Sequence, residues 1–409
     1  MSIGRAWKEV IQCPIARGDG RAHALLRMAP VPSGRAALAL TLTVAVRRSL
    51  AAASALIAIG CSTAADERLE ATDAGSPAKS PIGSAATGAT SSTSSGVDAG
   101  ACDPHEVVDT SPSVPARLSA TGLYRDISAR KLAAGVLPFA PQFPLWSDGA
   151  EKHRWVHLPG CAKIDTTDMD RWEVPIGTKI WKEFSFGGAR VETRYLHRWG
   201  PDRSDYVFQA YQWDPGATDA TSVPRDGVKD ANGTQHDIPG EWECVVCHGH
   251  APERVLGLSA IQLSHAGPGL TIASLSAAGR LTVPSAGFRV PGDATARAAL
   301  GYLHGNCAHC HNPSVEGETF TRPFSLKLLT TATTVEQTDA VVTAVGVAPG
   351  KFVHPGIPLR IAPGDPAKSA VAYRMSVRGS PEAMPALGSE IVDPAGLAAI
   401  TAWIGALAP

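Results

Sequence analysis

The stretch Tyr302-Leu-His-Gly-Asn-Cys307-Ala-His-Cys310-His311 decides how the C-terminal half of this chain is interpreted. A second copy of the same Cys-x-x-Cys-His pattern lies upstream, in Cys244-Val-Val-Cys247-His248. Two thiols three residues apart on a helical turn reach the two vinyl groups of one porphyrin, and the adjacent imidazole can bind its iron. The two copies therefore predict two covalently attached c-type haems. The expected thioether cysteines and axial histidines are Cys244, Cys247, Cys307, Cys310, His248 and His311.

Zinc is the main alternative cofactor, because paired Cys-x-x-Cys motifs can build one tetrahedral site of four thiolates. A zinc-stapled binding module therefore stays open as an interpretation. Both copies carry His in the next position, which an all-thiolate site does not require. Thioredoxin-type chemistry of the cytosol fits less well still, since the N-terminal region indicates export into an oxidising compartment.

Helices are expected on both sides of the second motif. Asp293 can cap a helix from Ala294 to about His304 that leads directly into Cys307. Asp365-Pro366 begins a second expected helix that extends to Arg378, by the signal of an N-cap followed by proline. Asp393-Pro394 begins a third in the same way. Its expected apolar stripe is Leu397, Ile400, Ile404 and Leu407, with Trp403 beside it.

The loop between the last two expected helices holds the predicted sixth ligand of the second haem. Met384 lies there before Pro385, where monohaem cytochromes c place a methionine, and thioether ligation raises the reduction potential. Met375 falls inside a predicted helix and is better explained by core packing.

The first haem is less complete in sequence. Residues 249–305 are too few for a full cytochrome fold, so its iron takes a ligand from elsewhere or stays open. We expect the β-rich region to cover this haem. Possible ligands are His265, His197 and Met169, while His250 is too close to His248 to reach the opposite haem face. His153 and His157 are expected to be structural or exposed, although each could ligate.

Residues 102–240 are predicted to form a β-rich domain. Lys179–Phe186 meets the turn signal Gly187-Gly188, and Arg190 to His197 alternates beyond it, which predicts a hairpin. Tyr206–Trp213 suits a third antiparallel strand of a sheet or small sandwich. The tryptophans of this region are expected in its core. They are Trp146, Trp155, Trp172, Trp181, Trp199 and Trp213.

The N-terminal region is typical of export. Residues 1–60 carry a net charge of +6 against −7 for the rest, and Arg47-Arg48 precede an apolar run that ends at Gly60-Cys61. This resembles a lipoprotein leader (1–61) with Cys61 as the lipid anchor. Residues 62–101 form an expected Ser/Thr/Ala/Gly tether. The expected location is the bacterial cell envelope, periplasmic and anchored to the outer membrane. The charge of −7 disfavours nucleic-acid binding.

Cysteine usage assigns the remaining thiols. Four cysteines belong to the motifs, Cys61 to the anchor and Cys13 to the leader, which leaves Cys102 and Cys161. In a periplasmic protein we expect these two to form a disulfide. Two separate buried thiols are the alternative.

Further stretches carry a resemblance to a known family. They are PLWSDGAEKHRW (144–155), WEVPIGTKIWKEFSF (172–186), APGDPAKSAVAYRM (362–375) and MPALGSEIVDPAGLAAITAWI (384–404). Together with the two motifs they resemble bacterial dihaem c-type cytochrome proteins that have an N-terminal β-rich region and a C-terminal cytochrome c-like domain. The resemblance spans about Tyr124 to the C-terminus. It implies periplasmic electron transfer through two covalent haems held by the six motif residues.

We therefore expect an α+β multidomain chain, with an antiparallel sheet or sandwich followed by a mainly α cytochrome c-like region. The expected divisions after the β-rich domain are a first haem-binding segment, 241–290, and a cytochrome c-like domain, 291–409. The first functional hypothesis is an electron carrier that exchanges electrons with redox partner proteins. A haem enzyme, such as a peroxidase or a dehydrogenase subunit, would need an open iron with an acid or base beside it. His309 is expected to point to solvent, and Glu243 is as readily a surface carboxylate as an acid or base of the site, so neither fixes such a group.

Overall fold

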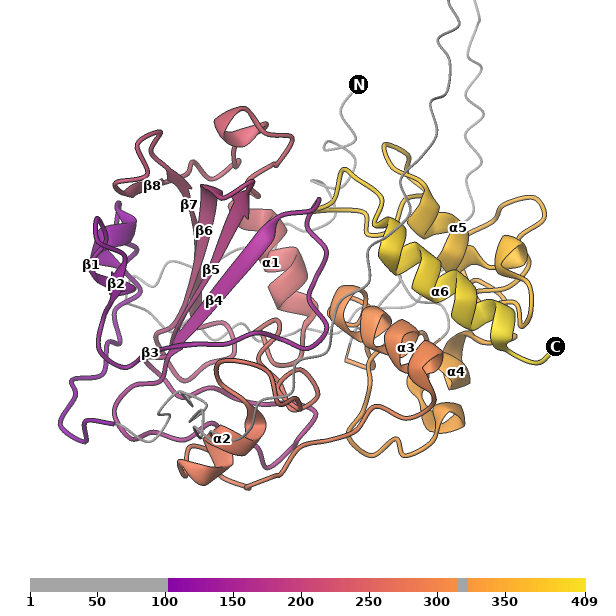
Figure 1. Cartoon of the computed structure of the whole chain (residues 1–409), viewed down its shortest axis with the longest axis horizontal. Helices are drawn as coiled ribbons and strands as arrows, with labels where there is room; N and C mark the ends of the chain where they lie inside the picture. Colours follow the sequence, from indigo (N-terminus) through magenta and orange to yellow (C-terminus); the bar gives the residue numbers. More distant parts are fainter. Residues whose placement is uncertain (1–101, 315–322) are drawn as a thin grey trace, which may run out of the picture. The chain divides into compact units, whose positions relative to one another are not determined.

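Six antiparallel strands, each paired with its neighbours in sequence, dominate the first half of the computed structural model, which describes residues 102–314 and 323–409 (Figure 1). The expected leader with Cys61 and the tether lie outside the described residues. The strands form one sheet, accompanied by a two-stranded ribbon, instead of a sandwich. The sheet contains β3 (Val136–Pro138), β4 (Glu151–His157), β5 (Lys179–Phe186), β6 (Ala189–Arg198), β7 (Tyr206–Trp213) and β8 (Ala220–Ser222), and the ribbon contains β1 (Tyr124–Asp126) and β2 (Lys131–Leu132).

The predicted hairpin is confirmed as β5 and β6. Gly187 and Gly188 form its turn with φ angles of +54° and +80°, and a two-residue turn needs positive φ at both positions to match the twist of its strands. The predicted third strand, Tyr206–Trp213, is confirmed as β7 and pairs with β6.

The two faces of the sheet differ in chemistry. One face is aromatic and packs beneath the ribbon and the short helix η2 (Leu118–Ala120). Its buried side chains are Trp181, Tyr195, Tyr211 and Trp213, so these tryptophans belong to the core as expected. The opposite face is apolar at one end, where Val156, Ile180 and Leu196 pack against the segment 255–281, which includes α2 (Ile272–Ala277). We call this second face the motif face, because the Cys-x-x-Cys-His segments lie on its side of the sheet.

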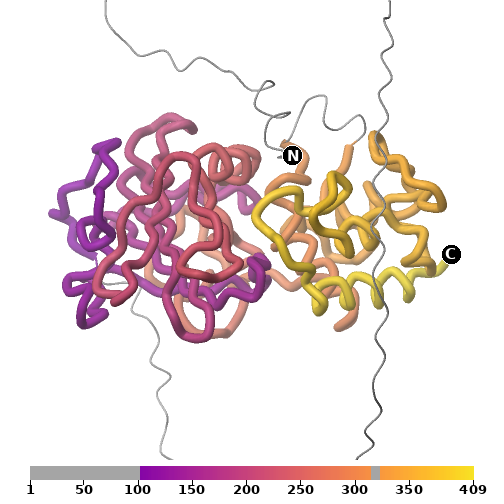
Figure 2. Tube along the Cα trace, turned by 90° about the horizontal axis from the view of Figure 1, so that it is seen from above, coloured from indigo at the N-terminus to yellow at the C-terminus, as the bar shows by residue number. Residues whose placement is uncertain are grey.

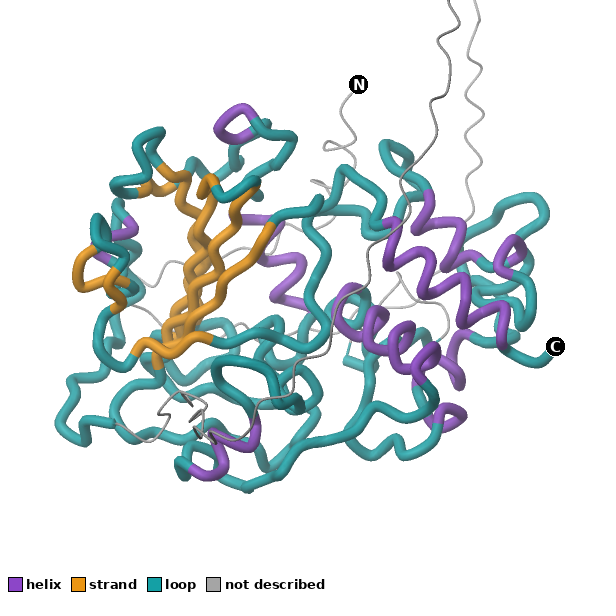
Figure 3. Tube along the Cα trace, viewed as in Figure 1, coloured by secondary structure: helices purple, strands orange, loops and turns teal. Residues whose placement is uncertain are grey.

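The helices follow the sheet in the chain and are joined by long loops (Figures 2 and 3). Asp293 caps α3 (Ala294–Asn306) by accepting from Ala296 N–H, and Asp393 caps α6 (Pro394–Ala406), which confirms both predicted starts. The two helices pack against each other, and a Cβ on Gly396 would collide with the Tyr302 ring. The other helical elements are η3 (Ala231–Gly233), α1 (Glu241–His250), η4 (Val335–Gln337), α4 (Asp339–Ala344), η5 (Pro366–Lys368) and α5 (Ala370–Ser376).

The expected helix from Asp365 to Arg378 is wrong as one continuous element. It is divided into η5 and α5, with Ser369 extended between them. Ala370 N–H donates to the Leu359 carbonyl, and the Ser369 hydroxyl donates to the Asp365 carbonyl. A bridge to a distant strand-like segment therefore replaces the local helical hydrogen bonds.

The loop 141–146, between β3 and β4, packs against the helices. Phe143 lies against Gly301 and Gly305 of α3, positions where a larger residue would collide with it. The Trp146 N–H donates to Asn306 Oδ1 at 2.6 Å, and its indole N–H donates to the Ile391 carbonyl at 2.9 Å. The fold is therefore mixed α+β, with both parts in direct contact. Among the described residues no helix is long and apolar enough to cross a bilayer.

The predicted disulfide is confirmed between Cys102 and Cys161, which are 59 residues apart in sequence. Because a crosslink of this span restricts the unfolded chain, replacing both cysteines by Ser should lower the free energy of unfolding by about 2–4 kcal/mol. Urea unfolding of the wild type and of the double variant checks this. Coincident unfolding midpoints would contradict it.

Candidate functional site at the two Cys-x-x-Cys-His segments

The first motif lies on α1, which begins at Glu241, just before it. Glu243 caps this helix, because its carboxylate accepts from Gly240 N–H at 2.8 Å. Its acidic side chain also suits the positive end of the helix dipole. Glu243 is thus a capping group of the first motif's helix. One helical turn then places Cys244 and Cys247 on the same side of α1.

The second motif continues directly from α3. Cys307 N–H donates to the Leu303 carbonyl, and His311 N–H donates to the Cys307 carbonyl at 2.8 Å, so the helical path extends through the motif as a series of turns. The predicted helix before Cys307 is confirmed and ends two residues later than expected. Both motifs therefore present two thiols and one imidazole on consecutive turns.

The four motif cysteines are free thiols in the structure and are partly buried. Burial raises the pKa of Cys244 to about 11 and the pKa of Cys307 and of Cys310 to about 12. The thiols are consequently protonated at neutral pH. Among the described residues, no three His, Cys, Asp or Glu side chains are grouped so that they could hold a metal ion. The four thiols therefore do not surround one tetrahedral site in this arrangement.

His248 is held in one tautomer. Its Nδ1–H donates to the Arg254 carbonyl at 2.7 Å, and a carbonyl can only accept, so the lone pair lies on Nε2. Its ring packs on Phe208 of β7, with ring centroids 4.6 Å apart. Burial lowers the pKa of His248 to about 4, with the Arg254 carbonyl acting in the opposite direction. A neutral, oriented imidazole of this kind is suited to bind a metal through Nε2.

His311 is also neutral at pH 7. Burial, followed by the charges of His309 and Arg374, lowers its pKa to about 4. Its ring packs on Phe324 with centroids 4.6 Å apart, and its carbonyl accepts from Leu326 N–H at 2.8 Å. Phe324 and Leu326 thus pack directly on the second motif.

The structure brings the two motifs together, which the sequence did not predict. Asn312, 3% exposed, donates its amide N–H to the carbonyl of His250 at 3.2 Å and to the carbonyl of Ala308 at 2.9 Å. The neighbouring Cys247 thiol contributes to the raised pKa of Cys310, after burial. Two cofactors attached here would therefore be neighbours.

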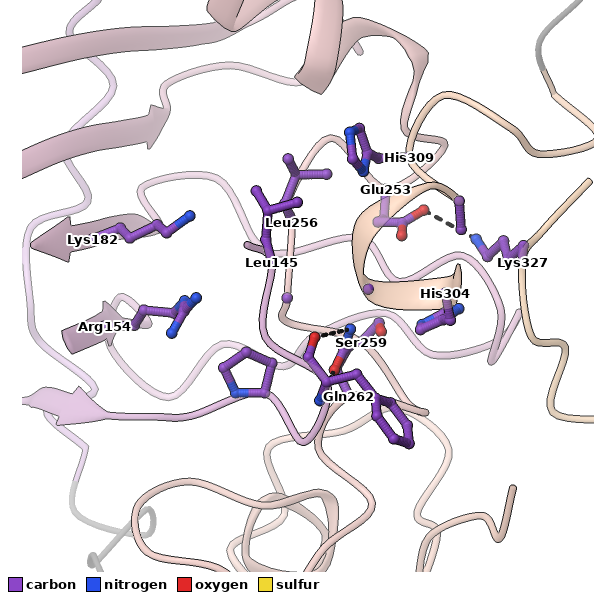
Figure 4. A pocket seen from close by; sticks show the side chains of 15 residues that line it. Leu145, Arg154, Lys182, Glu253, Leu256, Ser259, Gln262, His304, His309 and Lys327 are labelled. Atoms are coloured by element: carbon purple, nitrogen blue, oxygen red, sulfur yellow. Dashed lines mark hydrogen bonds and ion pairs between the residues drawn. The ribbon is translucent and has the colours of Figure 1, made fainter. Parts of the chain in front are cut away.

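Positively charged residues of the motif face point toward the motifs. Figure 4 shows Arg154 of β4 and Lys182 of β5 extending from the sheet toward a pocket that His304 and His309 also line. On the far side of the pocket, Lys327 Nζ is paired with Glu253 at 3.1 Å. The pocket is therefore rich in cations and lies beside the second motif.

His309 does not point to solvent as expected. It is partly buried, and burial followed by the charges of Lys182 and His250 lowers its pKa to about 4. The expectation followed from its place between the two cysteines, and the sequence gives no sign that the sheet packs over this turn. His309 thus lines the pocket as a neutral imidazole.

Met384 lies in the loop after α5, as predicted. Its N–H donates to the Arg374 carbonyl at 2.9 Å, and the Arg374 charge in turn acts on His311. Arg374 therefore connects the Met384 loop to the second motif. Met375 is 7% exposed in the helical core, in agreement with its predicted packing role.

The other candidate ligands lie away from the first motif or are already bonded. His197 lies on the aromatic face of the sheet, where its Nε2 bonds the Asp109 carbonyl at 3.0 Å. His153 and His157 share that face, near Glu183 and Glu106 respectively.

His265 uses both ring nitrogens on backbone groups, one with Ala140 and one with Gly267. Met169 packs against the apolar cluster that also includes Phe208, on which His248 stacks.

His304 makes the free energy of unfolding depend on pH. Burial, followed by the charge of Lys327, lowers its pKa to about 3, and its Nδ1 accepts from Leu328 N–H at 3.1 Å. The unfolded chain binds a proton here below about pH 6.5, whereas the folded protein does so only near pH 3. Stability should therefore fall by about 1.4 kcal/mol per pH unit between these values on account of this residue.

We predict that His304→Asn, which retains an acceptor near the Leu328 N–H, reduces the acid dependence of the unfolding free energy by about one proton. Urea titrations at several pH values between 7 and 4 measure the slope. The exposed His153→Asn controls for the loss of an imidazole. An equal slope in the wild type and in His304→Asn would contradict the prediction.

Comparison with protein-family models, with curated proteins and with solved structures gives no significant match for this chain. Function is therefore inferred from the residues of the site and their geometry.

Proposed function

We propose that this chain is a dihaem c-type cytochrome of the bacterial cell envelope that passes electrons between redox partner proteins. The observation that carries the proposal is the pairing of two Cys-x-x-Cys-His segments joined by Asn312, with His248 fixed as the tautomer that leaves Nε2 for a metal. Two thiols and one neutral imidazole in each segment are the donor set that a c-type haem requires. When bound, each haem would supply an iron that carries one electron.

The residues of the motifs would each have a defined task. Each cysteine thiol adds across a vinyl double bond, so that sulfur bonds one vinyl carbon, the thiol hydrogen goes to the other, and no oxidant is consumed. His248 and His311 would bind the iron through Nε2. The Arg254 carbonyl orients the His248 ring, which also raises its basicity as a ligand.

Water exclusion around the first cofactor would come from the sheet. Phe208 stacks on His248 and also packs against the apolar cluster of the motif face. A dry surrounding limits solvent reorganisation and affects the reduction potential. This fits the expectation that the β-rich region covers the first haem, and it gives the sheet a role in electron transfer.

The disulfide supports the proposed location in the cell envelope. The Cys102–Cys161 disulfide is stable in an oxidising compartment, and c-type attachment also takes place outside the cytoplasm. The leader and its lipid-anchor cysteine stay predictions from the sequence.

The decisive experiment is expression of the full chain in a host that matures c-type cytochromes, followed by a pyridine haemochrome spectrum and intact mass. We expect two haems per chain and a mass that includes both. The variants Cys244→Ala/Cys247→Ala and Cys307→Ala/Cys310→Ala should each lose one haem and retain the other. A colourless protein at bare polypeptide mass that binds one zinc ion would replace the proposal with the zinc-stapled module.

A haem enzyme is the second candidate, and the pocket beside the second motif favours it. His304, His309, Arg154 and Lys182 could position a small substrate there. Turnover of the matured protein with peroxide and a reduced dye tests this. Sustained turnover that falls in His309→Gln would support an enzyme, whereas electron exchange without turnover supports the carrier.

Met384 provides a test of the second haem alone. Removal of a thioether ligand lowers the reduction potential of the haem and leaves its iron with a weaker ligand field. Met384→Ala should therefore lower one of the two midpoint potentials and add a high-spin ferric signal in electron paramagnetic resonance. The matched control is Met375→Leu, a core substitution that should change neither. Unchanged spectra and potentials in Met384→Ala would show that the ligand is another residue.

A further inference from the structure

Three cations lie directly opposite one another across the centre of the motif face. Strand register pairs Arg154 of β4 with Lys182 of β5, and Lys182 with Arg194 of β6. We call these three residues the cation row. Like charges opposite each other on neighbouring strands destabilise a sheet. We therefore expect another interaction to offset the repulsion within the row.

Direct pairing with a carboxylate occurs at one end of the row only. Glu192 accepts from Arg194 at 2.6 and 3.0 Å and is shared with His236 at 2.7 Å. Within the described residues, neither Lys182 nor Arg154 forms an ion pair with a carboxylate. Lys182 lies over the Phe184 ring at 4.7 Å. Among the described residues, Lys182 and Arg154 therefore have no carboxylate within ion-pair distance, and Glu192 acts on Lys182 only through its charge.

Burial makes these charges costly. The Arg154 side chain is 7% exposed, and burial lowers its pKa to about 10. Burial, followed by the charges of Arg154 and Arg194, holds the pKa of Lys182 well below its usual range. The adjacent Lys152, on the same face, has its pKa lowered to about 8 for the same two reasons, burial and then neighbouring cations. Buried cations without counterions are strongly unfavourable, so this arrangement favours binding of an anion.

The row faces both motifs. The charge of Arg194 acts on the thiols of Cys244 and Cys247, and Lys182 acts on Cys247 and His309. Figure 4 shows Lys182 and Arg154 directed into the space beside the second motif. An anion bound by the row would thus lie beside any group attached to the motifs.

We propose that the cation row binds the propionate carboxylates of the haems attached at the two motifs. This inference rests on the proposed function, because each c-type haem brings two such carboxylates. Charge-assisted hydrogen bonds from Arg and Lys to carboxylates are among the strongest available, and the planar guanidinium of Arg suits bidentate contact.

The row would also set redox properties. Reduction adds one negative charge to a haem, and nearby buried cations stabilise that charge more strongly than they would in water. The cation row would therefore favour the reduced state and raise the reduction potential. The reduction potential can therefore be measured as a test that does not depend on any catalytic activity.

The test uses the matured full-length protein with Lys182→Gln and, separately, Arg154→Gln. Spectroelectrochemical titration should show that the equilibrium constant for reduction of at least one haem falls about tenfold, equivalent to ~59 mV for one electron. Lys182→Arg should retain the wild-type potential. The matched control is Lys179→Gln, three residues away on the same strand, whose charge is paired with Asp109 at 2.7 Å on the other face. It should leave both potentials unchanged.

Separate results distinguish the possible failures. Two haems per chain with unchanged potentials in both Gln variants would overturn the propionate proposal and leave the dihaem assignment intact. Absence of haem would overturn the proposed function and this inference with it. If inorganic phosphate at constant ionic strength shifts the wild-type potential, and the shift is lost in Lys182→Gln, the row is a site for free oxyanions and the propionate proposal fails.

Discussion

One side-chain amide determines the architecture of the site. Asn312 follows the second motif and donates to the carbonyl of His250, which ends the helix of the first motif 62 residues earlier in the chain. Because that carbonyl is at a helix end, it has no partner within the helix and is available to a distant donor. The bond fixes two otherwise separate turns side by side. Electron exchange between two haems attached at these motifs would require that adjacency.

The two faces of the sheet carry different kinds of side chain. Its aromatic face forms a conventional core with Trp181 and Trp213 at the centre. Its motif face combines an apolar end with a row of cations, an arrangement that costs stability in the chain alone. Such local conflict with folding preferences is typical of functional sites. The cost is explained if the chain folds around cofactors that carry negative charge, and folding and haem attachment are then coupled.

Local signals in the sequence were sufficient for the elements that they specify. Gly187-Gly188 predicts the hairpin, and Asp293 and Asp393 predict two helix starts, because turns and caps act within a few residues. The break at Ser369 could not be predicted, since it depends on a bridge to Leu359. The cation row and the contact between the motifs likewise depend on strand register and tertiary packing, which a single sequence does not reveal. The local elements that carry the motifs were thus predictable, and the arrangement of the motifs in space was not.

Anomalous diffraction at the iron edge, from crystals of the protein matured outside the cytoplasm, tests the central claim most directly. Two iron peaks are expected, one on the Nε2 side of His248 and one beside His311. A single peak at the zinc edge among the four thiols, with no iron signal, would contradict the account.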